Sequence, residues 1–240
     1  MRRHLLPFWD ERKAKVDMIV LHAVAYEPEQ AIKIFDAHQV SSHYLVAEDG
    51  EIWQLVGEKH RAWHAGCSSW QGRDDINSRS IGIEFFSSTL GQTPYSGAQL
   101  KAAVFLLRRL IRKYKIKPDK IVGHSDIAPS RKPDPGKAFF WKELADKGIG
   151  LWYDLKDADK IDKYSVGELL TLIGYDVQNE AAAVCAFCRR FLPERINNRS
   201  IEALVETPVQ EGLQTDEKFI RVLKATAYKY LNASKAPCKM

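Results

Sequence analysis

The sequence has few cysteines, and their distribution excludes a protein held together by disulfide bonds. The four cysteines among 240 residues are poorly suited to a disulfide framework. Cys185 and Cys188 form a C-x-x-C pair, but they lie in an apolar helical pattern, and no second pair completes a structural zinc site. Cys67 and Cys238 are single. We therefore expect a reduced protein whose C-x-x-C cysteines are core residues.

The chain also lacks the apolar segments that membrane insertion and secretion require. No apolar run is long enough to span a membrane, and residues 1–10 lack the continuous apolar core of a signal peptide. These absences favour the cytoplasm, with the periplasm or cell envelope as the alternative. The net charge of +5 suits anionic partners, but no nucleic-acid motif is present, so nucleic acid is not expected as a partner. The sequence does not indicate an oligomeric state.

A proline-rich loop carries side chains of the kinds that build catalytic sites. Residues 123–136 read GHSDIAPSRKPDPG and follow a predicted strand at Lys120–Gly123. His124 therefore emerges where a rigid strand gives way to a loop. The prolines restrict the backbone around Lys132 and Asp134, which reduces the entropy lost in holding these side chains in fixed directions.

A second histidine ends an apolar run near the start of the chain. Residues 17–22 read DMIVLH, a pattern typical of a buried central strand that ends at His22. A histidine in such a place is more often a core residue than a ligand. Catalytic zinc sites, however, commonly have three protein ligands and a water, and His22, His124 and Asp134 would supply three suitable donors.

Two further segments have the pattern of strands. Residues 43–47 and 52–56 flank an Asp-Gly pair, which predicts a β-hairpin. In residues 80–86 the period-two pattern places Gly82 and Glu84 on one face and the larger apolar side chains on the other. Glu84 is either an ordinary exposed residue of an edge strand or part of a face that Gly82 leaves open to a ligand.

Helical periodicity predicts five helices, at residues 28–38, 100–114, 165–174, 184–191 and 219–227. Ser165 and Glu168 form a capping-box pattern at the start of the third, and Gly174 is placed to end it. Thr215 is the expected cap of the last. The chain changes character near residue 150, where a polar link follows, so we predict two domains, residues 1–152 and 160–240.

The chain resembles the zinc-dependent N-acetylmuramoyl-L-alanine amidases of the type 2 family, which share a fold with peptidoglycan recognition proteins and phage amidases. The match extends over about residues 15 to 150 and is carried by the 123–136 loop and four blocks, residues 20–22, 40–56, 61–66 and 77–84. One departure is Ala23-Val24-Ala25 after His22, where members often have Tyr-Thr. The resemblance implies an α/β fold in which a mixed central β-sheet is flanked by helices.

The resemblance also implies a role for individual residues. His22, His124 and Asp134 would hold one Zn²⁺ ion, which lowers the pKa of a bound water and polarises the amide carbonyl. Glu84 would act as general acid and base, and Lys132 would stabilise the charge that develops on the carbonyl oxygen. The implied substrate contacts are Tyr44, Trp63, His64 and Asn77, although Trp63 is equally well read as a core aromatic.

The predicted small all-α domain of three helices resembles, more weakly, the peptidoglycan-binding module that follows the amidase domain in some relatives. That match rests on residues 169–177, LLTLIGYDV. A packing or partner-docking role is the alternative, because residues 194–214 depart from a compact module.

Two functions are compatible with the resemblance. The first is hydrolysis of the amide bond between N-acetylmuramic acid, including its 1,6-anhydro form, and L-alanine of peptidoglycan or muropeptide fragments. The second is binding of the same material without catalysis, which predicts a missing ligand or acid/base residue. Every such residue is present, so catalysis is favoured. Whether the substrate is intact wall or soluble anhydro-muropeptide stays open.

Overall fold

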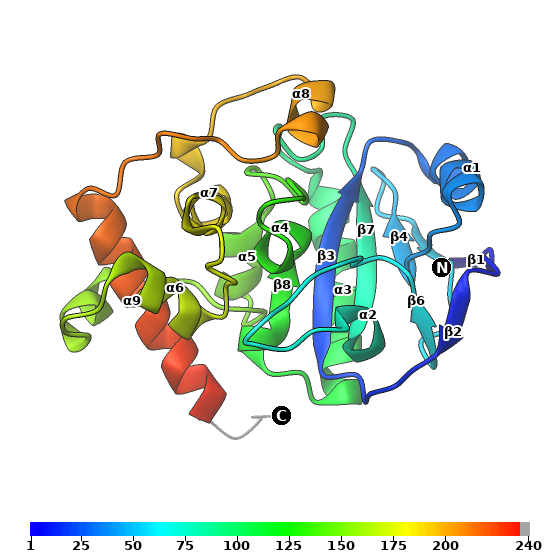
Figure 1. Ribbon diagram of the computed structural model, residues 1–240. Coiled ribbons are helices and arrows are strands. Elements are labelled where there is room, and N and C mark those ends of the chain that lie inside the picture. The colour runs from blue at the N-terminus through cyan, green and yellow to red at the C-terminus, as the bar shows by residue number, and fades with distance from the viewer. Residues whose placement is uncertain (236–240) are drawn as a thin grey trace.

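The computed structural model describes residues 1–235, and its centre is a mixed six-stranded β-sheet (Figure 1). The strands run in the order β1 (Arg2–Arg3), β5 (Ile52–Gln54), β4 (Tyr44–Val46), β7 (Ser80–Phe86), β3 (Met18–Val24) and β8 (Ile121–Gly123). β4 and β5 form the predicted antiparallel hairpin, and Gly50 in its turn has a positive φ of 85°. β4, β7, β3 and β8 are mutually parallel neighbours. The predicted α/β class with a mixed sheet is confirmed.

Helices cover both faces of this sheet. α3 (Gly97–Tyr114) packs on the face that carries Leu21 and Ile83, and a capping box between Ser96 and Gln99 begins it. α1 (Pro28–His38) covers the other face beside β4 and β5, where Leu45 contributes to its core. Shorter elements complete residues 1–152: β2 (Trp9–Glu11) paired with β6 (His60–Ala62), α2 (Ile76–Arg79), a 3-10 turn η1 (Pro118–Lys120), α4 (His124–Ile127) and α5 (Trp141–Asp146).

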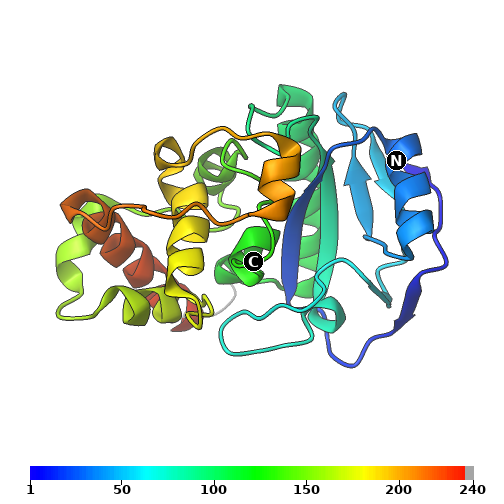
Figure 2. The same cartoon turned by 45° about the horizontal axis from the view of Figure 1, so that its top comes forward.

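Residues 155–235, called the helical part below, lie against the β8 edge of the sheet (Figures 1 and 2). They contain η2 (Leu155–Lys160), α6 (Val166–Ile173), α7 (Glu180–Phe191), η3 (Pro193–Arg195), α8 (Ile201–Glu206) and α9 (Glu217–Lys235). The Ser165 capping box and Gly174 behave as predicted. The Thr215 cap is wrong by one residue, because Asp216 accepts the hydrogen bond from Phe219 N.

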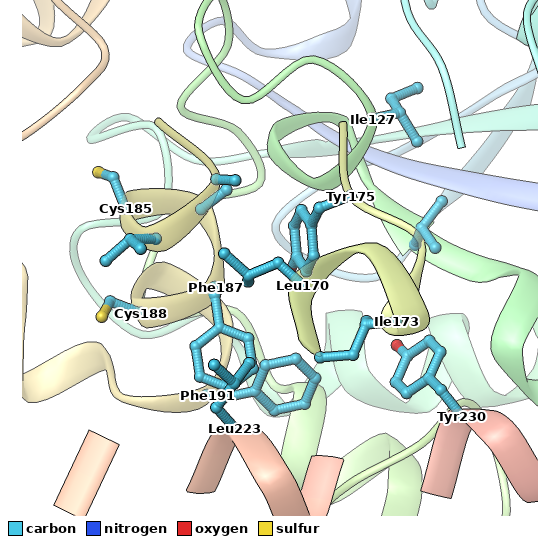
Figure 3. Close-up of a cluster of buried hydrophobic side chains, with 14 of the residues drawn as sticks. Ile127, Leu170, Ile173, Tyr175, Cys185, Phe187, Cys188, Phe191, Leu223 and Tyr230 are labelled. Carbon is cyan, nitrogen blue, oxygen red and sulfur yellow. The ribbon is translucent and has the colours of Figure 1, made fainter. Parts of the chain in front are cut away.

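One apolar cluster joins the sheet to the helical part (Figure 3). Met18, Val20 and Val122 of the sheet belong to the same cluster as Leu170 and Phe187 of the helical part. Cys185 and Cys188 are buried in it as free thiols, as predicted, whereas Cys238 lies outside the described residues. The core is therefore continuous across the predicted boundary between residues 152 and 160. No described helix is long and apolar enough to cross a membrane.

Candidate active site

The candidate site lies where three neighbouring parallel strands approach their carboxyl ends. His22 of β3 is directly opposite Glu84 of β7, and Leu21 is opposite Gly123, so His124 begins α4 beside His22. The chain then returns at Asp134, whose backbone carbonyl accepts a hydrogen bond from Ser125 N at 2.8 Å. In open α/β sheets this edge is the usual place for ligands.

His22, His124 and Asp134 form a compact triangle of possible metal donors. The His22 and His124 Nδ1 atoms are 3.0 Å apart, and Asp134 Oδ2 lies 3.1 Å from His124 Nδ1 and 3.4 Å from His22 Nδ1. Ligands about 2.0–2.2 Å from a tetrahedral zinc ion stand about 3.3–3.6 Å from one another. The spacing of the three donors is therefore close to one face of such a site.

In each of the two imidazoles, the hydrogen bond made by Nε2 determines whether Nδ1 has a free lone pair for a metal. His124 Nε2 lies 3.2 Å from the Ala65 carbonyl oxygen, which can only accept, so the proton is on Nε2. His22 Nε2 donates to His64 Nδ1 at 3.0 Å, His64 Nε2 donates to Ser80 Oγ at 3.1 Å, and Ser80 Oγ donates to the Ile76 carbonyl at 2.7 Å. Both Nδ1 lone pairs then face the Asp134 carboxylate. Three acceptors turned towards one point suit a cation.

The charges of these groups favour the same conclusion. Burial lowers the pKa of His22 to about 4, so its imidazole is neutral at pH 7, the form that binds metals. Burial opposes the charge of Asp134, but the adjacent His124 and His22 outweigh it and hold the pKa of Asp134 well below its usual range. The triangle is thus an ionised carboxylate beside neutral imidazole.

Glu84 flanks the triangle, and Lys132 is near enough for its charge to act on Glu84 and His22. Glu84 Oε1 is 4.0 Å from His22 Nδ1, and the described residues offer its carboxylate no hydrogen-bond partner. Burial, and then the charge of Asp134, raise the pKa of Glu84 well above its ordinary value, whereas the charge of Lys132 opposes the rise. Lys132 is half-buried on the loop that bears Asp134. A buried carboxylate with a raised pKa beside a cation is a group suited to proton transfer.

Tyr44 is not part of this site. Its register opposite Ile83 turns the side chain to the face under α3, where its hydroxyl contacts Glu58 and Arg109. The side chain is fully buried there. The prediction that Tyr44 contacts the substrate is therefore wrong.

His64 and Asn77 lie behind the candidate metal donors, and their predicted contacts with substrate stay predictions. Both ring nitrogens of His64 are engaged, and Asn77 Oδ1 accepts hydrogen bonds from the backbone N–H groups of His64 and Ala65 at 3.0 and 2.8 Å. Gly82 makes room for this arrangement, because a Cβ atom there would lie 2.5 Å from His64 Cγ. The small residue beside Glu84 thus accommodates a histidine rather than a ligand, contrary to the expectation from the sequence.

Trp63 is half-buried beside Phe8, with ring centroids 6.4 Å apart, and its role as a substrate contact stays a prediction. Supporting groups that sequence reasoning missed include the Ala65 carbonyl, which also accepts from Arg131 at 3.0 Å. Tyr95 was missed too, and its hydroxyl donates to the Pro135 carbonyl at 2.7 Å. No sequence signal marks these residues, since their partners are distant in the chain.

Fold and site together define a hydrolase built around a candidate metal centre. The Amidase_2 family, described as N-acetylmuramoyl-L-alanine amidase, matches residues 12–137. The N-acetylmuramoyl-L-alanine amidase AmiD of Escherichia coli is 36% identical over 216 residues, which cover 78% of each chain. The chain belongs to the N-acetylmuramoyl-L-alanine amidase family.

Other relatives differ in how much of the chain they match. The 1,6-anhydro-N-acetylmuramyl-L-alanine amidase AmpD of Enterobacter cloacae is 48% identical over 105 residues, 44% of this chain and 55% of its own. The structure of E. coli AmiD in complex with anhydro-N-acetylmuramic acid-L-Ala-D-gamma-Glu-L-Lys covers 92% of this chain and 93% of its own, at 31% identity and a TM-score of 0.75. Pseudomonas aeruginosa AmpDh3, in complex with anhydromuramic pentapeptide, covers 90% of this chain and 92% of its own at 31% identity and the same TM-score. These two structures extend over both the sheet and the helical part.

Proposed function

We propose that this chain is a zinc-dependent amidase that hydrolyses the bond between the lactyl group of N-acetylmuramic acid and L-alanine. The observation that carries the proposal is the convergence of His22 Nδ1, His124 Nδ1 and Asp134 Oδ2 on one point beside Glu84, whose carboxylate has no hydrogen-bond partner among the described residues. A zinc ion at that point supplies a Lewis acid that polarises the amide carbonyl and activates water.

The chain's own residues perform the remaining steps. Glu84 accepts a proton from the attacking water and returns it to the leaving α-amino nitrogen of L-alanine. Burial raises its pKa well above the ordinary value for a glutamate, so it holds a proton more readily than an exposed carboxylate does, which suits return of the proton to the leaving nitrogen. Lys132 donates to the carbonyl oxygen on which negative charge develops. His64 and the Ala65 carbonyl hold the two imidazoles in the required tautomers.

The same site argues against binding without catalysis, because none of the expected ligands or acid/base residues is missing. As substrate we propose a muropeptide that carries 1,6-anhydro-N-acetylmuramic acid. Two observations support this choice: AmiD and AmpDh3 structures hold such compounds, and AmpD is named for the 1,6-anhydro substrate. The compartment in which this chain meets its substrate stays a prediction.

Mass spectrometry of a purified 1,6-anhydro-muropeptide incubated with the protein tests this proposal. The protein is used as prepared, after chelation, and after zinc is restored. We expect release of a free stem peptide that begins with L-alanine, loss of this release on chelation, and recovery with zinc. If the zinc-loaded protein leaves both the muropeptide and whole sacculi uncleaved, the proposed reaction is wrong.

A further inference from the structure

A buried arginine of the helical part reaches into the loop that carries His124. Arg190 of α7 places Nη1 2.6 Å from Asp126 Oδ2, and the two side chains are 2% and 1% exposed. Its other terminal nitrogen donates to the Ile121 carbonyl at 3.2 Å, and its guanidinium lies 4.0 Å from the ring centre of Trp141. One side chain of the helical part thus contacts β8, α4 and α5.

Asp126 is the centre of this cluster. Besides Arg190, its carboxylate accepts hydrogen bonds from Gly123 N at 2.8 Å and from the Tyr175 hydroxyl at 2.7 Å. Gly123 caps α4, and His124 is the first residue of that helix. The carboxylate therefore closes the single turn that presents the His124 imidazole.

The contacts bracket the ligand on both sides. Arg190 holds the carbonyl of Ile121 before His124 and the carboxylate of Asp126 after it. The intervening Ser125 N–H donates to the Asp134 carbonyl, so the backbone that carries the other loop ligand is tied to the same turn. A shift of α4 would move two of the three candidate donors.

We propose that Arg190, Asp126 and Tyr175 are positioning residues for His124, so that the helical part completes the metal site. This inference rests on the proposed function. Without their hydrogen bonds, α4 would shift and His124 Nδ1 would move away from His22 Nδ1 and Asp134 Oδ2, so a metal would be held more weakly. Supporting residues around metal ligands typically contribute about 10–100-fold to affinity.

Attachment of the helical part does not by itself require this pair. The apolar cluster of Figure 3 already joins the two parts, and burying a charged pair costs desolvation that apolar packing avoids. The neighbouring Arg189 shows the difference. It is as buried as Arg190, at 3%, but its hydrogen bonds go to Cys185 Sγ and the Pro208 carbonyl, both within the helical part.

The first test compares Arg190→Gln with Arg189→Gln in the full-length protein. Zinc affinity is measured by competition with a chromophoric chelator, and the geometry of the site is followed by the absorption spectrum of bound Co²⁺. We expect Arg190→Gln to weaken zinc binding about tenfold and to alter the Co²⁺ spectrum, with Arg189→Gln within twofold of wild type. Arg190→Lys should recover part of the loss, since it keeps the charge but cannot reach both Asp126 and Ile121.

The second test removes single hydroxyl groups and remains informative if Arg190→Gln does not fold. Tyr175→Phe deletes one hydrogen bond to Asp126, whereas Tyr228→Phe deletes a hydroxyl on a half-buried ring of α9 that lies against Lys160. We expect Tyr175→Phe to weaken zinc binding about two- to fivefold and Tyr228→Phe to leave it unchanged.

The outcomes separate this inference from the proposed function. Zinc binding and a Co²⁺ spectrum that are the same in Arg190→Gln and Tyr175→Phe as in their controls would overturn the positioning role. A wild-type protein that binds zinc but cleaves no muropeptide would overturn the proposed reaction and leave the positioning test intact. A wild-type protein that binds no zinc would overturn both.

Discussion

Glu84 and Glu58 are equally buried glutamates, each 8% exposed, on opposite sides of the central sheet. Glu58 accepts hydrogen bonds from Arg109 and Lys113 at 2.7 Å, from Tyr114 at 2.6 Å, and from Tyr44. Burial opposes its charge, but these donors outweigh burial and lower its pKa to about 2. Within the part of the chain that the structure describes, Glu84 has no such donors, and burial raises its pKa.

The two carboxylates are equally exposed, but burial acts more strongly on the pKa of Glu84, whereas hydrogen-bond donors outweigh burial at Glu58. On the α3 side, a fully paired carboxylate ties a loop to a helix and contributes to stability. On the other side, a carboxylate without a hydrogen-bond partner among residues 1–235 lies beside the candidate metal triangle. The sheet thus separates a face where the carboxylate stabilises the fold from the face on which we place the proposed chemistry.

We expect the largest loss of turnover from removing a candidate metal ligand on the face of the sheet that carries Glu84. Asp134→Ala deletes one of the three donors and should release the metal, and with it nearly all turnover. The zinc content after dialysis, measured by atomic emission, checks this. Asp146→Ala, which removes an exposed aspartate of α5, is the control. Full zinc retention in Asp134→Ala would mean that the third ligand lies elsewhere.

Lys132→Ala should affect turnover without affecting the metal. Loss of a donor to the developing oxyanion typically lowers kcat on the order of 10²–10³-fold. Steady-state kinetics of muropeptide cleavage and zinc content are measured together, with the exposed Lys142→Ala as control. If Lys132→Ala loses its zinc, Lys132 holds the loop together and the oxyanion role fails.

On the opposite face, Glu58→Gln should lower stability and leave metal content and turnover unchanged. The substitution leaves Arg109 and Lys113 without their buried counter-charge, which should lower the free energy of unfolding by about 2–3 kcal/mol. Zinc content and kcat of the folded protein should not change. Urea unfolding measures the effect against Glu29→Gln, an exposed position on α1.

The same carboxylate predicts a dependence of stability on pH. Its pKa is depressed from 4.5 to about 2 in the folded protein, so its contribution is complete above about pH 4.5 and is lost as pH falls to about 2. Unfolding free energies of wild type and Glu58→Gln should therefore converge over this interval. A constant difference between the two curves would show that Glu58 contributes by packing alone.

Tyr44→Phe should have the smallest effect. It tests whether Tyr44 contacts Glu58 and Arg109, as in the structure, or the substrate, as the sequence predicted. Losing the hydroxyl that contacts Glu58 should cost about 1 kcal/mol of stability, because one hydrogen bond to a charged group is removed while others remain. KM should stay at the wild-type value. A KM that rises severalfold would restore Tyr44 to the substrate groove.

Local patterns predicted most elements of the sheet and its helices. The bounds of α1 match residues 28–38, and the β4–β5 hairpin follows from its Asp-Gly turn. His124 and Asp134 of the loop became candidate ligands because, together with His22 at the end of an apolar strand, they supply three donors of the kinds that zinc sites use. The resemblance then implied a metal-ligand role for His22 and an acid/base role for Glu84, and both roles stay predictions.

What the sequence could not predict depends on contacts between distant residues. β4 reads Tyr-Leu-Val, apolar on both faces, so no alternation reveals which face Tyr44 joins. Gly82 and His64 meet across 18 positions, and Arg190 meets Asp126 across 64. The error at Thr215 is of another kind, since Asp216 beside it is an equally good capping residue.

The proposed acid/base role of Glu84 is tested by the turnover of Glu84→Gln per bound zinc, measured beside Glu58→Gln. We expect Glu84→Gln to keep one zinc per chain and its stability but to lose about 10²–10⁴ in kcat, the usual contribution of a general acid/base. Zinc-loaded, folded Glu58→Gln should keep wild-type kcat. Wild-type turnover by zinc-loaded Glu84→Gln would show that Glu84 is not the acid/base residue.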